Sequence, residues 1–250
     1  MQKRLLIIVA CIVFGLSLLA HLPAKLVFPK NSGKFQFIGI SGSLWRGDIR
    51  KILFSGKIVP VRNLNWSVRP LALLTGTLKA GFNEQRIPDN RGTLGISLFS
   101  RKIELYELHW QASSKSFGAA GLLQGLRARG EIVLDFETLQ FPADMSFPSQ
   151  VEGRLDWQNA ELQFGTENWQ IGSPVIQLSG GGAVIRGLAK NSQPMLPGDS
   201  SFQCTMKSCQ VTVSLQPSPD APQSMLNGLM LLGLQQAGDK FSGQITVPLE

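Results

Sequence analysis

A two-residue alternation of apolar and polar side chains runs through most of the chain after Gly33 and limits what it can fold into. In NLNWSVRP, Leu64, Trp66 and Val68 alternate with polar neighbours, and VEGRLDWQNAELQF repeats the pattern later in the chain. Successive side chains of a β-strand point to opposite faces, so this period predicts half-buried antiparallel strands. We therefore expect residues 35–250 to form one mainly β domain, an elongated, curved antiparallel sheet with few short helices.

Two stretches carry helical signals within this β pattern. In LTGTLKAGF, Leu74 and Leu78 are expected on the buried face of a strand, although Pro70 just before them suits the start of a short helical turn. The apolar run in SPDAPQSMLNGLMLLGLQQAGD predicts a helix near residues 223–236, with Gly238 available to end it.

The tryptophans recur loosely, in GSLWRG, LNWSV, ELHWQA and GRLDWQNAEL. Their spacing is similar without being fixed, so the chain has no true repeat. The recurrence indicates one strand-and-turn arrangement used several times along the sheet.

The N-terminus predicts a membrane anchor. After MQKR, residues 5–22 hold 18 residues without a charge, which at about 1.5 Å per residue nearly match a hydrocarbon core of about 30 Å. A cleaved signal peptide has an apolar region of about 7–15 residues and small residues three apart at the cleavage site, whereas Ala20 and Ala24 lack small partners there. We expect a cytoplasmic tail (1–4), an uncleaved transmembrane helix (5–22) and a linker (23–34).

The cysteines bear on the compartment. Cys204 and Cys209 flank a short loop between two alternating segments, which suits a disulfide that closes a hairpin, the alternative being two free buried thiols. Cys11 lies within the apolar span. Lysines flank the span on both sides, but a large following domain can translocate despite them. Export and a disulfide together favour an oxidising compartment such as the periplasm, with a single-pass anchor in the bacterial inner membrane.

Composition and motifs argue against several classes of function. The net charge of +7 comes with only 16% charged residues and no basic run, so we interpret the positive charge as spread thinly over the surface. Such a surface favours mild attraction to anionic membranes and does not favour binding of nucleic acid. His109 is the sole histidine of the body, which leaves too few ligands for zinc. SGGGAVIRG lacks dinucleotide-binding spacing. We predict no enzyme, metal or cofactor, and keep an envelope enzyme only as a third hypothesis.

Several stretches in order carry a family resemblance: ISGSLWRGDIRKI, NLNWSVRPLALLTGTLKA, GLLQGLRARGEIVL and the late cysteine pair. On these the chain resembles the type II secretion system protein N family of Gram-negative bacteria over nearly its whole length. The resemblance implies an accessory inner-membrane component, with a scaffolding or assembly role in export of folded proteins across the outer membrane. It implies other components of that system as partners, no enzymatic activity, and Trp45, Arg46, Trp66, Arg69 and Pro70 as the candidate structural or interaction motif.

Two questions stay open at this stage. The family is also similar to AsmA-like proteins, whose curved sheets hold lipid chains, so a periplasmic lipid-binding or lipid-transfer protein is the alternative function. For the Trp45–Arg46 pair we favour a structural role, in which Trp45 buries its ring and Arg46 lays its stem over that ring with the charge outside. The alternative makes Arg46 a contact to a partner or to lipid headgroups.

Overall fold

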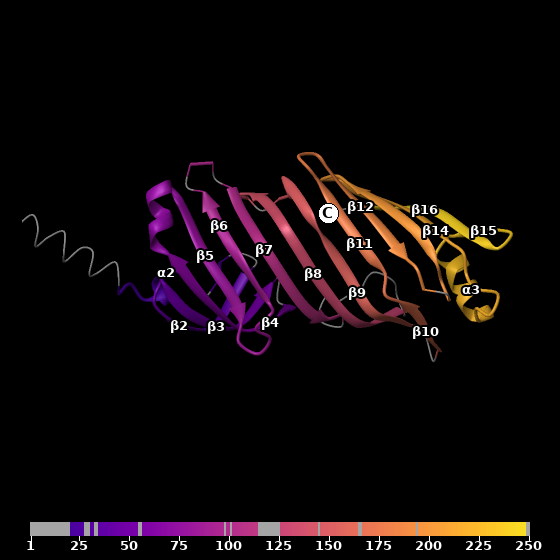
Figure 1. Cartoon of the computed structure of the whole chain (residues 1–250), viewed down its shortest axis with the longest axis horizontal. Helices are drawn as coiled ribbons and strands as arrows, with labels where there is room; N and C mark the ends of the chain where they lie inside the picture. The colour runs from indigo at the N-terminus through magenta and orange to yellow at the C-terminus, as the bar shows by residue number, and fades with distance from the viewer. Residues whose placement is uncertain are drawn as a thin grey trace, which may run out of the picture. The chain divides into compact units, whose positions relative to one another are not determined.

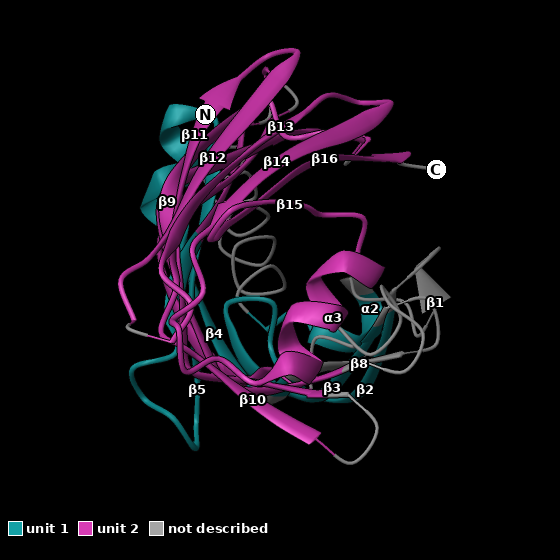
Figure 2. Cartoon of the chain, turned by 90° about the vertical axis from the view of Figure 1, so that its right-hand side faces the viewer, with its two compact units in different colours: residues 1–93 teal, residues 94–250 magenta. Residues whose placement is uncertain are grey.

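Antiparallel strands make up most of the structure, a computed structural model (Figure 1). By its internal contacts the chain divides into two compact units, unit 1 (Met1–Thr93) and unit 2 (Leu94–Glu250) (Figure 2). The predicted mainly β, antiparallel class is confirmed. The single domain over 35–250 and the elongated outline stay predictions. The structure describes residues 21–27, 31–32, 35–54, 57–97, 99–100, 102–114, 126–144, 146–164, 167–193 and 195–248.

Unit 1 is a meander in which each strand pairs with the next. Its buried core consists of Ala24, Ile40, Ile49 and Trp66. The elements are α2 (Ala24–Val27), β1 (Asn31–Ser32), β2 (Phe35–Gly42), β3 (Arg46–Phe54), β4 (Lys57–Arg69), the 3₁₀ helix η1 (Pro70–Thr75), β5 (Thr77–Glu84) and β6 (Arg91–Ser97), which contains the boundary between the units.

A short helix interrupts the alternation between β4 and β5. Pro70 supplies the fixed φ of a first helical residue, and the N–H of Gly76, a residue with a left-handed φ of 69°, donates to the carbonyls of the last turn. The predicted helical turn is confirmed. The expectation that Leu74 faces the core from a strand is wrong, because the strand begins only at Thr77 and Leu74 lies exposed on η1.

Unit 2 is a longer meander with one offshoot, β10, which pairs only with the C-terminal part of β9. Its elements are β7 (Lys102–Ser113), β8 (Leu126–Pro142), β9 (Gln150–Phe164), β10 (Glu167–Gly172), β11 (Val175–Gly181), β12 (Val184–Asn191), β13 (Gly198–Cys204), β14 (Ser208–Leu215), α3 (Gln223–Leu231), β15 (Gln235–Ala237) and β16 (Lys240–Pro248).

The strands of unit 2 separate apolar from polar side chains as the alternation predicts. Leu155 of β9 pairs with Ile176 of β11, and both are half-buried. Arg154 and Gln177, the next pair along, are exposed on the opposite face. Helix α3 lies against the apolar face, on the inner side of the curved sheet of this unit (Figure 2).

Helix α3 is shorter than predicted. It ends at Leu231 because Gly233, with a φ of 85°, turns the chain while its N–H donates to the Met230 carbonyl at 2.9 Å. The N–H of Leu234 donates to the Leu229 carbonyl at 3.2 Å, and both leucines are buried in one cluster, which completes a Schellman motif. The helix therefore exists, but its predicted end near residue 236 and its stop at Gly238 are wrong.

The core of unit 2 lies between α3, β10 and the sheet. Gly228 of α3 lets the helix approach the ring of Trp169, since a Cβ there would collide with that ring. The buried members of this cluster are Ala160, Trp169, Ile171, Leu196, Met225, Leu229, Leu234 and Phe241. Apolar burial of this kind is the main source of stability for the unit.

The predicted anchor falls mostly outside the described residues, which include only its last two positions, His21 and Leu22. Within the part of the chain that the structure describes, no helix has the length and apolar character needed to span a bilayer. The anchor at 5–22 therefore stays a prediction.

Phe241→Ala should lower the free energy of unfolding of the chain by about 3–5 kcal/mol, because it removes a ring that is 1% exposed and leaves a cavity beneath α3. Phe99→Ala, at a ring that is 86% exposed, is the control and should change stability by less than about 0.5 kcal/mol. Urea denaturation followed by tryptophan fluorescence measures both. Equal losses in the two variants would contradict this core.

Candidate functional site

The stretch GSLWRG is the turn of the β2–β3 hairpin. Gly42 pairs with Gly47 at the last rung, and the Ser43 N–H donates to the Arg46 carbonyl at 2.9 Å to close the turn. Trp45 is half-buried and Arg46 is exposed. The two residues singled out in the sequence therefore lie side by side at a hairpin tip.

Trp66 of β4 lies in NLNWSVRPLALLTGTLKA, the second of the stretches that carry the family resemblance, and its side chain contacts this hairpin tip. Its ring lies over Gly47, and its Nε1–H donates to the Leu44 carbonyl at 3.1 Å. The Val68 N–H donates to the Trp45 carbonyl at 2.7 Å. Trp66 is 8% exposed, so it is the buried tryptophan of the motif.

The chain that enters unit 1 is attached to the same tip. The Leu44 N–H donates to the Leu22 carbonyl at 2.8 Å, and Pro23 forms a bridge with Ser43. Ala24 is fully buried in the cluster around Trp66. The segment that follows the predicted anchor is thus held by hydrogen bonds and by packing.

The structure brings the five predicted motif residues to one corner of unit 1. Arg69 ends β4 one residue after the bond between Val68 and the tip, and Pro70 begins η1. Arg69 and Arg46 are both exposed. Ring packing and backbone hydrogen bonds dominate the corner, which supports a structural role for it. The roles of Trp45 and Arg46 themselves stay predictions.

Unit 2 holds an apolar cavity of about 390 Å³ beneath α3. Its volume falls within the range of roughly 300–1,000 Å³ seen for small-molecule sites. Residues from β9, β10, β12, β13, β14, β16 and α3 line it, among them Trp157, Trp169, Leu196, Val213, Met225 and Leu229. The sequence did not predict this cavity, because the alternation indicates an apolar face but not where a helix leaves part of that face uncovered.

The polar face of unit 2 carries ion pairs between neighbouring strand residues. His109 of β7 pairs through Nδ1 with Asp135 of β8, and both side chains are well exposed. Arg154 Nε lies 2.6 Å from Asp156 Oδ1, and this hydrogen bond raises the pKa of the exposed guanidinium. Solvated surface pairs of this kind contribute little to stability.

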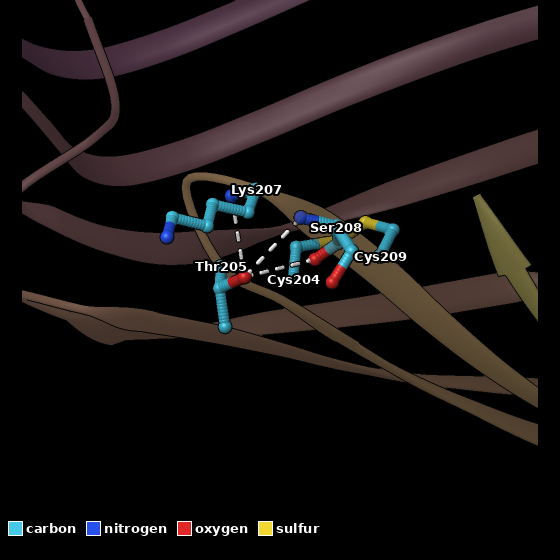
Figure 3. Close-up of a disulfide and its surroundings, with 5 residues drawn as sticks. All are labelled: Cys204, Thr205, Lys207, Ser208 and Cys209. Carbon is cyan, nitrogen blue, oxygen red and sulfur yellow. Dashed lines mark hydrogen bonds between the residues drawn. A yellow bond between two sulfur atoms is a disulfide. The ribbon is translucent and has the colours of Figure 1, made fainter. Parts of the chain in front are cut away.

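Cys204 and Cys209 form a disulfide across the β13–β14 hairpin (Figure 3). They are direct cross-strand partners. Thr205 Oγ1 donates to the Ser208 carbonyl and accepts from the N–H groups of Lys207 and Ser208, which tightens the loop. The hairpin and the pairing agree with the expectation from the sequence.

Comparison with known proteins identifies the family. The family model for type II secretion system (T2SS), protein N, matches residues 34–243, which include both tryptophan stretches and the disulfide. The chain belongs to the type II secretion system protein N family. It is therefore a component of type II secretion, as the resemblance implied. No curated protein and no solved structure matches the chain.

In this T2SS protein N family member, Gly47→Ala should lower the free energy of unfolding by about 1–3 kcal/mol, because the new Cβ meets the Trp66 ring and the Ser41 carbonyl. Gly81→Ala is the matched control in β5, since the nearest atom to its Cβ, Ser67 Oγ, lies 3.6 Å away. Urea denaturation and the tryptophan emission maximum report the result. A tolerated Gly47→Ala would show that the ring does not need this glycine.

Proposed function

We propose that this family member is an accessory inner-membrane component of the type II secretion system. Residues 5–22 anchor it by a single pass, and residues 35–250 lie in the periplasm. There the protein acts as a scaffold or assembly factor that contacts other components of the system and has no catalytic activity. The match over residues 34–243 supports the system in which it works, and the disulfide supports an oxidising compartment.

The attachment of the incoming chain is the observation that carries the scaffold role. Leu22 and Pro23 bind the hairpin tip, and Ala24 is buried beside Trp66. A flexible linker would leave the domain free to rotate about its anchor. A segment fixed at the first residues after the apolar span instead orients unit 1 relative to the membrane, which a scaffold requires.

A topology and secretion experiment tests this proposal. Alkaline phosphatase fused at Glu250 should be active and a fluorescent protein there dark, and the mature chain should keep its N-terminus. Purified, denatured protein should show one alkylated cysteine, Cys11, and all three after reduction. Deletion of the gene should lower secretion of folded type II substrates, and the full chain should restore it. A cytoplasmic C-terminus would contradict the topology, and unchanged secretion would contradict the function.

A lipid-binding or lipid-transfer protein is the second candidate function. The cavity beneath α3 is the observation in its favour, because its lining is almost entirely apolar and would shield an acyl chain from water. In this hypothesis the cavity holds a lipid tail, whereas a pure scaffold has no use for the space.

Neighbouring serines on opposite faces of β13 give a matched test. Ser200 lines the cavity and Ser201 lies on the other face of the strand. Ser200→Phe should fill the cavity and abolish co-purified lipid in native mass spectrometry, whereas Ser201→Phe should retain it. Lipid-free wild-type protein would remove support for this candidate, and lipid that survives Ser200→Phe would place the ligand elsewhere.

A further inference from the structure

Among the described residues of unit 1, the most exposed large apolar side chains belong to two short helices. Leu26 of α2 is 73% exposed, and Leu71 and Leu74 of η1 are 78% and 85% exposed. The other exposed large apolar residues described in this unit, Ile38 and Ile87, reach only 46% and 38%. Isolated exposed leucines are ordinary, but three on the same end of a unit need a reason.

Hydrogen bonds to the hairpin tip hold both helices at the end of unit 1 where the chain enters. Leu26 lies four residues after Leu22, whose carbonyl accepts from the Leu44 N–H of the tip. Helix η1 begins two residues after Val68, which donates to Trp45 in the same tip. Both helices lie at the left-hand edge of unit 1 in Figure 1, and Figure 2 shows them on different sides of that end.

Helix η1 is an ordered turn that exposes Leu71 and Leu74, while Leu73 is half-buried. Thr75 Oγ1 donates to the Ala72 carbonyl at 2.8 Å, and the Gly76 N–H donates to the Leu73 carbonyl at 3.0 Å. No residue of η1 is fully buried, and Leu71 and Leu74 add little apolar burial to the fold. Two leucines that an ordered helix holds exposed are suited to a contact outside the chain.

Charge is concentrated in the same unit. Residues 1–93 hold 14 Lys and Arg against 3 Asp and Glu, a net charge of +11, whereas residues 94–250 hold 10 against 14, a net charge of −4. The interpretation of a thinly spread charge is therefore wrong. Lys25, Arg46 and Arg69 are exposed beside the leucines or at the hairpin tip.

Unit 1 has only three acidic residues, Asp48, Glu84 and Asp89, and Asp48 lies one rung from the hairpin tip. Asp48 accepts a hydrogen bond from Ser41. Glu84 is buried and accepts from Asn90 at 2.8 Å in the loop after β5. An apolar edge bordered by cations has the chemistry of an anionic bilayer surface, where leucines enter the interface and cations meet phosphates.

We propose that this end of unit 1 is a membrane-docking surface, in which Leu26, Leu71 and Leu74 insert into the bilayer interface and Arg46 and Arg69 contact anionic lipid headgroups. The proposal rests on the anchored topology above and deepens it. The anchor holds the domain near the bilayer, and the docking surface fixes which face meets the lipid. The surface is built from unit 1 alone and does not depend on the side of the membrane.

Site-specific fluorescence on the full chain tests the docking surface. In a Cys11→Ser background the remaining cysteines are disulfide-bonded, so Leu71→Cys or Leu74→Cys can be labelled with the environment-sensitive probe NBD. Leu188→Cys, at a leucine of unit 2 that is 63% exposed, is the control. The protein is reconstituted into vesicles of phosphatidylcholine and phosphatidylglycerol. The vesicles are prepared with and without lipids that carry a doxyl quencher near the headgroup. Unfolding midpoints equal to the parent show that the variants fold.

Probes at residues 71 and 74 should emit at shorter wavelength than the probe at 188, lose intensity to doxyl lipid and resist iodide, an aqueous quencher. Arg46→Gln with Arg69→Gln, or vesicles without phosphatidylglycerol, should reduce the doxyl quenching. Iodide quenching at 71 and 74 equal to that at 188 would overturn the proposal. Protection from both quenchers would also overturn it, because it would show burial against protein.

Carbonate extraction of the same vesicles separates this proposal from the anchor. If the protein resists extraction but iodide quenches its probes at 71 and 74, the anchor is supported and the docking surface is overturned. Protein that is extracted, but whose probes were quenched by doxyl lipid beforehand, supports docking and overturns the anchor.

Discussion

An aromatic ring laid over a cross-strand glycine is the interaction on which both units depend. Trp66 covers Gly47 in unit 1. In unit 2, Phe136 lies over Gly153 and Phe202 lies over Gly187. In each case the two residues are direct partners across neighbouring strands. The missing Cβ lets the ring lie flat on the sheet, where it buries apolar area that a sheet with one apolar face would otherwise expose to water.

This interaction explains how so few helices suffice in the described parts of the chain. The rings shield the parts of the apolar face over which they lie, and α3 covers another part in unit 2. Trp157 extends the pattern, since its ring approaches Gly130 and its Nε1–H donates to the Arg129 carbonyl at 2.9 Å. Trp66 makes the same kind of bond to the Leu44 carbonyl. The loose recurrence of tryptophans in the sequence therefore reflects a repeated local interaction, even though the chain has no repeat of fixed length.

Local patterns predicted the elements well and their long-range partners poorly. The two-residue period gave the antiparallel class, the cysteine spacing gave the hairpin, and Pro70 gave the start of η1. Nothing local chooses Gly233 over Gly238 as the end of α3, because the choice depends on whether Leu234 packs against Leu229. Trp66, and not Trp45, lies over Gly47 because of the register between β3 and β4, which pairs residues far apart in sequence. The spacing of tryptophans along the chain therefore could not show which of them is buried.

Side chains of the stretch from Trp66 to Thr75 point both to the core and to solvent, because the backbone changes from a β-strand to a 3₁₀ helix at Pro70. Before the proline, the strand sends Trp66 inward onto the hairpin tip. After it, the 3₁₀ helix turns Leu71 and Leu74 outward, where a continued strand would have buried alternate residues. Pro70 therefore marks the boundary between the residues that pack in the corner of unit 1 and the leucines that this packing leaves exposed. A stretch with both properties can hold the domain together and meet another surface, so structural and interaction roles for this motif are compatible.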